Sequence, residues 1–124
     1  MNYPVGDFLI QIKNAALARK QEVVVANTKL IRAVAGVLKS LGYLEKIKED
    51  AGKITVQITY HRKEPLIGQV RLVSKPGLRI YASVDDLEKK KGPSAFIIST
   101  PQGVMSSKDA IKKRLGGEII AEVL

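Results

Sequence analysis

The sequence has no cysteine, no tryptophan and a single histidine, and these absences exclude several kinds of chemistry. Without cysteine there can be no disulfide, no thiolate nucleophile and no sulfur ligand for a metal. His61 lies between polar neighbours with no serine or acidic residue at a catalytic spacing, and the Asp and Glu residues show no metal-ligand pattern. Glycine-rich motifs that bind nucleotide phosphates are also missing. We therefore predict that the protein is not an enzyme and has no cofactor, metal or small-molecule substrate.

Long hydrophobic runs are absent as well. No apolar stretch approaches the roughly 20 residues that a membrane-spanning helix needs. The apolar positions after Met1 are interrupted by Asp7, Gln11 and Lys13, which does not fit a secretory signal peptide. We expect an intracellular, cytoplasmic protein with no membrane partner.

Aromatic residues make up only 5% of the chain, and Phe8 and Phe96 fall at positions expected in the core. No pair of aromatic residues lies on one strand, as in sheets that stack unpaired bases. This argues against recognition of single-stranded nucleic acid.

What the chain has in excess is positive charge. Lys and Arg number 21 against 12 Asp and Glu, for a formal net charge of +9. Residues 1–63 contain 11 basic and 5 acidic side chains (net +6), and residues 64–124 contain 10 and 7 (net +3). Such a bias in a small domain indicates a polyanionic partner, usually nucleic acid, that spans both halves of the chain.

The first half of the sequence predicts an α-β-α-β-β order. Apolar residues at helical spacing from Val5 to Ala16 predict an opening helix, and the β-branched run Glu22–Ala26 predicts a strand. Asn27 or Thr28 is expected to cap a second helix that ends before Gly42, with Leu30 on its apolar side. Lys29, Arg32 and Lys39 share the opposite face. Tyr43–Glu49 and Lys53–Tyr60 are predicted to form a hairpin.

The second half is predicted to be rich in β structure. Strands are expected at Gly68–Ser74 and Leu78–Ala82, joined by a type II turn at Lys75-Pro76-Gly77. Asp85–Lys91 is expected to form one helical turn. The polar stretch His61–Pro65 is the best boundary. The overall prediction is an α+β fold of two small lobes: an N-terminal α-β-α-β-β lobe (residues 1–63) and a β-rich C-terminal lobe with one short helix (residues 64–124).

The last quarter of the chain is the most informative stretch. An apolar strand, Ala95–Ile98, runs into a hydroxyl-rich turn, Ser99–Gly103, and a short basic helix follows, capped by Ser106 or Ser107. The pair Gly116-Gly117 then leads into a terminal strand, Glu118–Val123. The turn and the glycine pair should lie at neighbouring ends of adjacent strands. A surface of small hydroxyls and main chain there suits close approach to another backbone.

Double-stranded RNA fits these features, because its wide, shallow minor groove displays 2′-hydroxyls to small donors. Ser99 and Thr100 are the candidate donors on the turn, and Tyr81 on a neighbouring strand is placed to stack or donate beside them. An ordinary Ser/Thr turn is the alternative. In the first half, Asn27, Thr28 and Lys29 at the start of the second helix offer backbone amides and a cation to a phosphate.

Two stretches closely resemble the S-eight family of small-subunit ribosomal proteins, in its bacterial form. The first is Val73–Tyr81, which reads VSKPGLRIY, and the second runs from Ser99-Thr100 through Gly103-Val104-Met105 to Gly116-Gly117-Glu118. The opening helix adds further matches at Pro4, Asp7, Leu9, Ile12, Lys13 and Asn14.

This resemblance implies a two-lobed protein that binds the central domain of small-subunit ribosomal RNA early in assembly, among neighbouring ribosomal proteins. It also implies that the Ser-Thr loop enters the RNA minor groove, and some family members bind a similar structure in their own messenger RNA. A DNA-binding regulatory module is the alternative, although no convincing helix-turn-helix is present. The RNA-binding residues carried over are Ser99, Thr100, Gly103, Tyr81, Glu118, Gly117, Lys75, Arg79, Asn14, Thr28 and Lys29.

Two positions of the loop depart from the family pattern. Pro101 stands where a third hydroxyl is common, and Gln102 stands where a basic residue is common. The loop therefore lacks one donor and one charge. Pro101 is expected to compensate by stiffening the turn, because a fixed φ lowers the entropy lost on binding.

Overall fold

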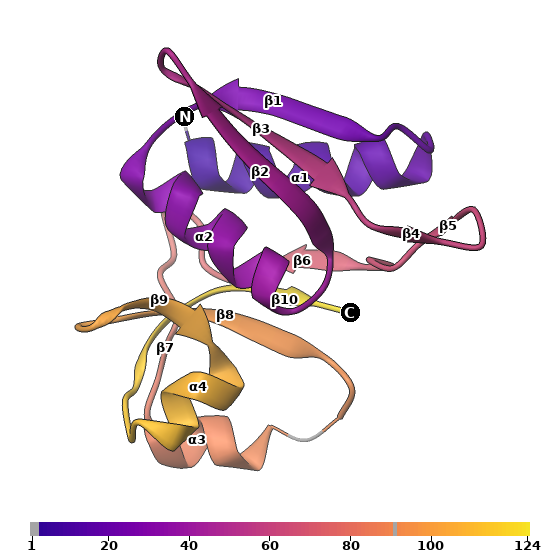
Figure 1. Cartoon of the computed structure of the whole chain (residues 1–124). Coiled ribbons are helices and arrows are strands. Elements are labelled where there is room, and N and C mark those ends of the chain that lie inside the picture. Colours follow the sequence, from indigo (N-terminus) through magenta and orange to yellow (C-terminus); the bar gives the residue numbers. More distant parts are fainter. Residues whose placement is uncertain (1–2, 91) are drawn as a thin grey trace.

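The computed structural model describes residues 3–90 and 92–124 and shows two regions stacked one on the other (Figure 1). The N-terminal region (residues 3–63) contains a helix, a strand, a second helix and a hairpin in the predicted order. Residues 64–124, which we call the C-terminal region after the predicted division, contain a second sheet and two short helices. The strand Tyr60–His61 pairs with Glu64–Pro65 across that predicted division. In the described part of the chain, no helix is both long and apolar enough to span a membrane. The elements of the N-terminal region are α1 (Pro4–Leu17), β1 (Glu22–Ala26), α2 (Lys29–Ser40), β2 (Leu44–Asp50), β3 (Lys53–Ile58) and β4 (Tyr60–His61).

The C-terminal region adds strands and helices in close succession. Its elements are β5 (Glu64–Pro65), β6 (Val70–Leu72), β7 (Tyr81–Ala82), α3 (Val84–Lys89), β8 (Ala95–Thr100), β9 (Gly103–Ser106), α4 (Ser107–Lys112) and β10 (Gly117–Val123). The expected α+β class is therefore confirmed. The predicted helical turn at Asp85–Lys91 is α3, and Lys91 lies outside the described residues.

Local signals explain the N-terminal elements. Thr28 caps α2, its Oγ1 accepting a hydrogen bond from the Ile31 N–H at 3.2 Å, and Gly42 follows the helix with φ of +91°. Strands β2 and β3 form a hairpin with its turn at Ala51-Gly52. The other edge of β3 pairs with β1, so the sheet has the order β1-β3-β2. One expectation is wrong: Leu30 is exposed, and Ile31 is buried in its place. Val34 and Leu38 face the core as expected.

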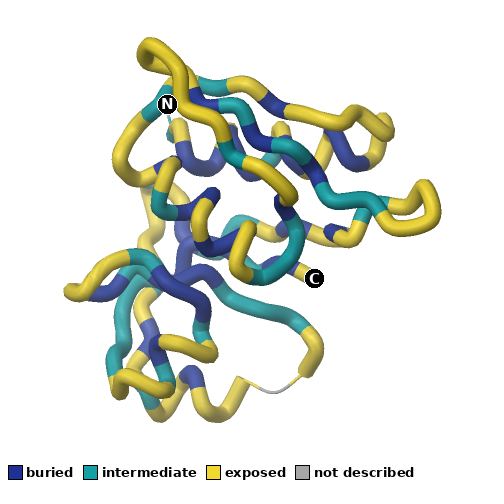
Figure 2. The backbone as a smooth tube through the Cα atoms, viewed as in Figure 1, coloured by how far each residue is buried: buried dark blue, intermediate teal, exposed yellow. Residues whose placement is uncertain are grey.

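The second sheet is covered on both faces. It has the order β6-β10-β8-β9, with β7 also paired to β10. Because successive side chains of a strand point to opposite faces, Ile97 packs into the core shared with the N-terminal region, whereas Ile98 packs against α3 and α4. A bulge between Ile119 and Ala121 turns the later half of β10 so that Ala121 also faces the shared core. Figure 2 shows this buried layer between the two regions.

Several expectations for the C-terminal region need correction. Ser99 and Thr100 belong to strand β8, so the turn is only Pro101-Gln102, and β9 after it was not foreseen. The strands expected at Gly68–Ser74 and Leu78–Ala82 shorten to β6 and β7, because the chain between them closes into its own small loop. The turn at Pro76-Gly77 is present, but φ of Gly77 is not positive, so the type II assignment is wrong. Proline at the second position suits a type I turn equally well.

Helix α3 begins with a capping box that offers a titration test. The Ser83 N–H donates to Asp86 Oδ2 at 3.0 Å, and Ser83 Oγ accepts from the Asp86 N–H at 3.2 Å. The backbone and side-chain hydrogen bonds of Ser83 lower the pKa of the Asp86 carboxyl below its usual value. A depressed pKa means that the carboxylate stabilises this helix start at neutral pH, and that the contribution is lost as pH falls through the folded-state pKa.

We expect NMR titration of Asp86 to give a midpoint below that of an unstructured aspartate. Ser83→Ala removes the hydroxyl partner and should move the midpoint back part of the way, because the backbone hydrogen bond remains. An ordinary midpoint in the unmodified protein would mean that the capping box does not form in solution.

Candidate nucleic-acid interface

Three of the predicted interface residues lie side by side across three strands. Glu118 of β10 is paired with Ser99 of β8 on one side and with Tyr81 of β7 on the other. Directly paired residues of antiparallel strands have their side chains on the same face. The row of Ser99, Glu118 and Tyr81, which we call the junction row, therefore combines a hydroxyl, a carboxylate and a phenol. Side chains alternate along β8, so Ser99 is on the same face as Ile97 and on the opposite face from Ile98. Ile97 packs into the core shared with the N-terminal region, and the junction row is therefore on the sheet face that turns toward that region.

Exposure differs along the junction row. Tyr81 is 70% exposed. Ser99 and Glu118 are half-buried in the neighbouring strands. The phenol ring is therefore accessible to a partner, and the two smaller polar groups lie at the base of the same surface.

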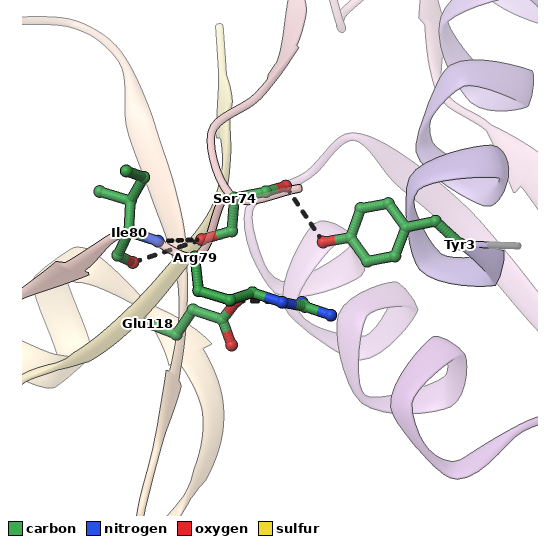
Figure 3. Close-up of polar contacts among 5 residues, drawn as sticks. All are labelled: Tyr3, Ser74, Arg79, Ile80 and Glu118. Carbon is green, nitrogen blue, oxygen red and sulfur yellow. Dashed lines mark hydrogen bonds and ion pairs between the residues drawn. The ribbon is translucent and has the colours of Figure 1, made fainter. Parts of the chain in front are cut away.

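A cation is attached to this row. Arg79 Nη1 donates to Glu118 Oε2 at 3.2 Å, and the Arg79 guanidinium carbon lies 5.3 Å from the centroid of the Tyr3 ring (Figure 3). The Tyr3 hydroxyl donates to the Ser74 carbonyl at 3.2 Å. Burial is the largest influence on Tyr3 and raises the pKa of its hydroxyl, so this group donates as a neutral phenol at physiological pH.

The segment that holds Arg79 and Lys75 is closed by a buried serine. Ser74 Oγ accepts from the Ile80 N–H at 2.9 Å and donates to the Ile80 carbonyl at 3.3 Å, and Ser74 is fully buried. Inside this closure, the backbone of Lys75 forms two hydrogen bonds with Leu78. Lys75 is exposed at the start of this short turn.

Thr100 has a role within the turn that the sequence did not reveal. Its side chain is buried, its hydroxyl donates to the Gly103 carbonyl at 2.7 Å, and its Oγ1 accepts from the Gln102 N–H at 3.2 Å. The expectation that both Ser99 and Thr100 offer hydroxyl donors from a loop therefore needs revision, because the Thr100 hydrogen is already donated inside the turn. Gly103 has φ of +118°, a conformation that L side chains rarely adopt.

Gly117 is explained by the packing of the protein itself. A Cβ on Gly117 would collide with the Ser99 carbonyl oxygen and lie 2.9 Å from its carbon, and a Cβ on Gly116 would lie 3.0 Å from Ser83 Cα. The glycine pair thus lies next to the turn, as predicted. The backbone that it approaches is the chain's own.

The three N-terminal candidates do not join the junction row. Thr28 and Lys29 are exposed at the start of α2, on the same side of Figure 1 as the turn between β8 and β9. Asn14 is exposed near the other end of α1, roughly 16 Å along the axis from Tyr3 at about 1.5 Å per residue. A single partner that contacts all three would have to extend across the N-terminal region.

Tyr3 and the buried Ser74 are polar residues beside this surface that sequence reasoning missed as site residues. Ser74 is inside a motif that carried the family resemblance, but its hydroxyl closure with Ile80 is visible only in three dimensions. Tyr3 gave no signal, because nothing local connects a tyrosine before α1 with an arginine 76 residues later in the chain.

The structure thus defines a basic α+β protein with a row of polar side chains across β7, β10 and β8 and a cation paired with it. Comparison with known proteins is in agreement: residues 3–124 match the family model described as ribosomal protein S8. The chain belongs to the ribosomal protein S8 family. Since this is a family of ribosomal proteins, membership confirms the prediction that the chain is not an enzyme.

Curated relatives match over nearly their whole length. Proteins called small ribosomal subunit protein uS8 are 39% identical in Coxiella burnetii, over 99% of this chain and 98% of that protein, and 36% identical in Nitratidesulfovibrio vulgaris, over 97% and 96%. The protein of the same name in Wolbachia pipientis is 40% identical over 96% and 95%. The resemblance drawn from the sequence is therefore confirmed.

Proposed function

We propose that this protein is a structural constituent of the small ribosomal subunit in the cytoplasm, and that it binds small-subunit ribosomal RNA. Its membership in the ribosomal protein S8 family carries this proposal. The net charge of +9 supports it, because a positively charged protein binds the phosphate backbone of a nucleic acid favourably. Its other partners are neighbouring proteins of the small subunit.

The junction row is the proposed centre of the RNA contact. Its groups are short or flat, which suits the shallow minor groove of a folded RNA helix better than long side chains do. Ser99 supplies a hydroxyl, Tyr81 an exposed ring, and Lys75 and Arg79 supply charge beside them. The RNA proposed is a helix of the central domain, and its binding promotes assembly of the subunit.

Thr100 and Gly103 support this contact by shaping it. The Thr100 hydroxyl holds the turn closed, and the positive φ of Gly103 allows β9 to return. Gly117 lets β10 lie close to β8 and so brings Glu118 beside Ser99. Thr28, Lys29 and Asn14 are proposed as separate backbone contacts on the N-terminal region.

The hydroxyls can be tested separately by filter binding to a central-domain fragment of small-subunit ribosomal RNA. We expect Ser99→Ala to weaken binding about fivefold, equivalent to about 1 kcal/mol for one neutral hydrogen bond. Thr100→Ala should weaken binding to a similar degree but also lower the melting temperature, because its hydroxyl has two partners inside the turn. Thr55→Ala, on a strand of the other sheet, is the matched control and should leave binding unchanged.

Unchanged binding by a Ser99→Ala/Thr100→Ala double variant would remove the turn from the interface. Equal affinity for duplex DNA of the same length would favour the DNA-binding alternative. Binding to the protein's own messenger RNA is part of the proposal, and competition between that RNA and the ribosomal fragment measures it directly.

A further inference from the structure

Tyr3 connects the two regions of the molecule at the edge of the junction row. It precedes α1 in the N-terminal region, yet its hydroxyl donates to Ser74 and its ring faces the Arg79 guanidinium, both in the C-terminal region (Figure 3). Its ring contacts Arg79, which is also paired with Glu118 of the junction row.

The Tyr3 ring is held in place by the helix that follows it. A Cβ on Gly6 would collide with Tyr3 Cδ2 and lie 2.8 Å from Cε2, so the ring packs closely against the first turn of α1 at Gly6. The same Cβ would lie 3.2 Å from Leu72 Cδ1, and Tyr3 and Leu72 are both partly buried against the shared core. The hydrogen bond to the Ser74 carbonyl fixes its remaining freedom.

Arg79 is thereby held from two directions. The Glu118 carboxylate binds one end of the guanidinium at 3.2 Å, and the Tyr3 ring lies 5.3 Å from its central carbon. The Arg79 side chain nevertheless stays 43% exposed. A guanidinium has five N–H donors in a fixed plane, so one that is oriented and still accessible can bind phosphate oxygens in pairs.

We propose that Tyr3 is a positioning residue for RNA binding, which holds the Arg79 guanidinium in the orientation that receives a backbone phosphate beside the junction row. This inference rests on the proposed function. Preorganisation is the physical reason: a free arginine loses rotamer entropy when it binds, and a ring that already orients it removes part of that cost. The arrangement also explains how Glu118 is tolerated near a polyanion, because its charge is paired with Arg79.

The test is RNA binding over a series of salt concentrations. Affinity falls as salt rises, so the slope of log affinity against log salt concentration is negative. Losing one phosphate contact lowers the magnitude of this slope by about one, so that a lower slope is a shallower one. We expect Arg79→Gln to weaken binding severalfold at low salt and to lower the slope by about one. Tyr3→Leu should lower the slope to a similar extent although it removes no charge, and Tyr3→Phe should keep the wild-type slope because it keeps the ring.

The double variant Tyr3→Leu/Arg79→Gln should bind no more weakly than Arg79→Gln alone, because both changes remove the same interaction with phosphate. Arg71→Gln is the matched control: Arg71 is paired with Glu122 at 2.8 Å, the same type of ion pair farther along β10, and its removal should leave the slope unchanged. Should Tyr3→Leu fail to fold, Gly6→Ala displaces the ring while keeping the tyrosine, and the same decrease in slope is expected.

The outcomes separate the two proposals. If the unmodified protein shows no preference for the ribosomal RNA fragment, the proposed function itself is wrong. If it binds and Arg79→Gln lowers the slope, but Tyr3→Leu and Gly6→Ala leave the slope unchanged, then Tyr3 is only a packing residue and the inference fails. An additive decrease in affinity in the double variant would overturn it in the same way.

Discussion

Gly117→Ala is expected to lower the free energy of unfolding by about 3 kcal/mol, at the upper end of the usual cost of overpacking. The added methyl group would collide with the Ser99 carbonyl oxygen and press on Thr100 Cα at 3.2 Å. Both contacts are backbone atoms of β8, and no side-chain rotation can relieve them. Gly117 has no positive φ, so the cost is steric rather than conformational.

Urea unfolding followed by circular dichroism measures this effect, and Gly36→Ala is the opposite control. Gly36 lies within α2, is exposed, and has no atom within 4 Å of a built Cβ. Alanine there should raise stability by about 0.5 kcal/mol through its higher helix propensity. If Gly117→Ala were as stable as the unmodified protein, β8 and β10 would not approach each other as described. The same variant should also bind RNA poorly, because it separates Ser99 from Glu118.

Ile97→Ala is expected to lower the free energy of unfolding by about 3 kcal/mol, as truncation of a fully buried isoleucine typically does. Ile97 is on the sheet of the C-terminal region but packs into the core shared with α1, α2 and β3. Its truncation should therefore be felt in both regions. Hydrogen exchange should show reduced protection in residues 1–63 as well as in residues 64–124.

Leu87→Ala supplies the comparison for the proposed division at residues 63 and 64. Leu87 is equally buried, but it packs with Ile98 and Ala110 in the second core cluster between the sheet and helices α3 and α4. We expect its truncation to reduce protection mainly within 64–124. An equal reduction in both regions from Leu87→Ala would mean that the two lobes are one cooperative unit, and a reduction confined to 64–124 from Ile97→Ala would mean that the core is not shared.

Much of the N-terminal region could be predicted because its signals are local. The spacing of apolar residues in α1, the Thr28 cap of α2 and the two-residue turn before β3 each depend on a few neighbouring residues. The elements of the C-terminal region were harder to predict from the sequence. Strand β9 is only four residues long, and its Met105 and Ser106 read equally well as the approach to a helix.

Of the candidate site, the sequence located the turn and the glycine pair but not their geometry. It could not show that Ser99, Glu118 and Tyr81 are in register, because register depends on the pairing of three strands and on the bulge in β10. Thr100 was predicted to be a free hydroxyl donor, whereas in the tertiary structure the Thr100 side chain is buried and donates to the Gly103 carbonyl.

By its sequence alone, this protein is a basic, cysteine-free α+β chain of the ribosomal protein S8 family, with its distinctive residues near the C-terminus. Composition, periodicity and motif order settle these properties, since each is written in neighbouring residues or in the residue types themselves. Only the tertiary structure decided which polar groups share a surface and which face inward. The contact of Tyr3 with Arg79 and the fit of Gly117 against Ser99 join segments distant in the chain, and such contacts follow from how the sheet and helices pack.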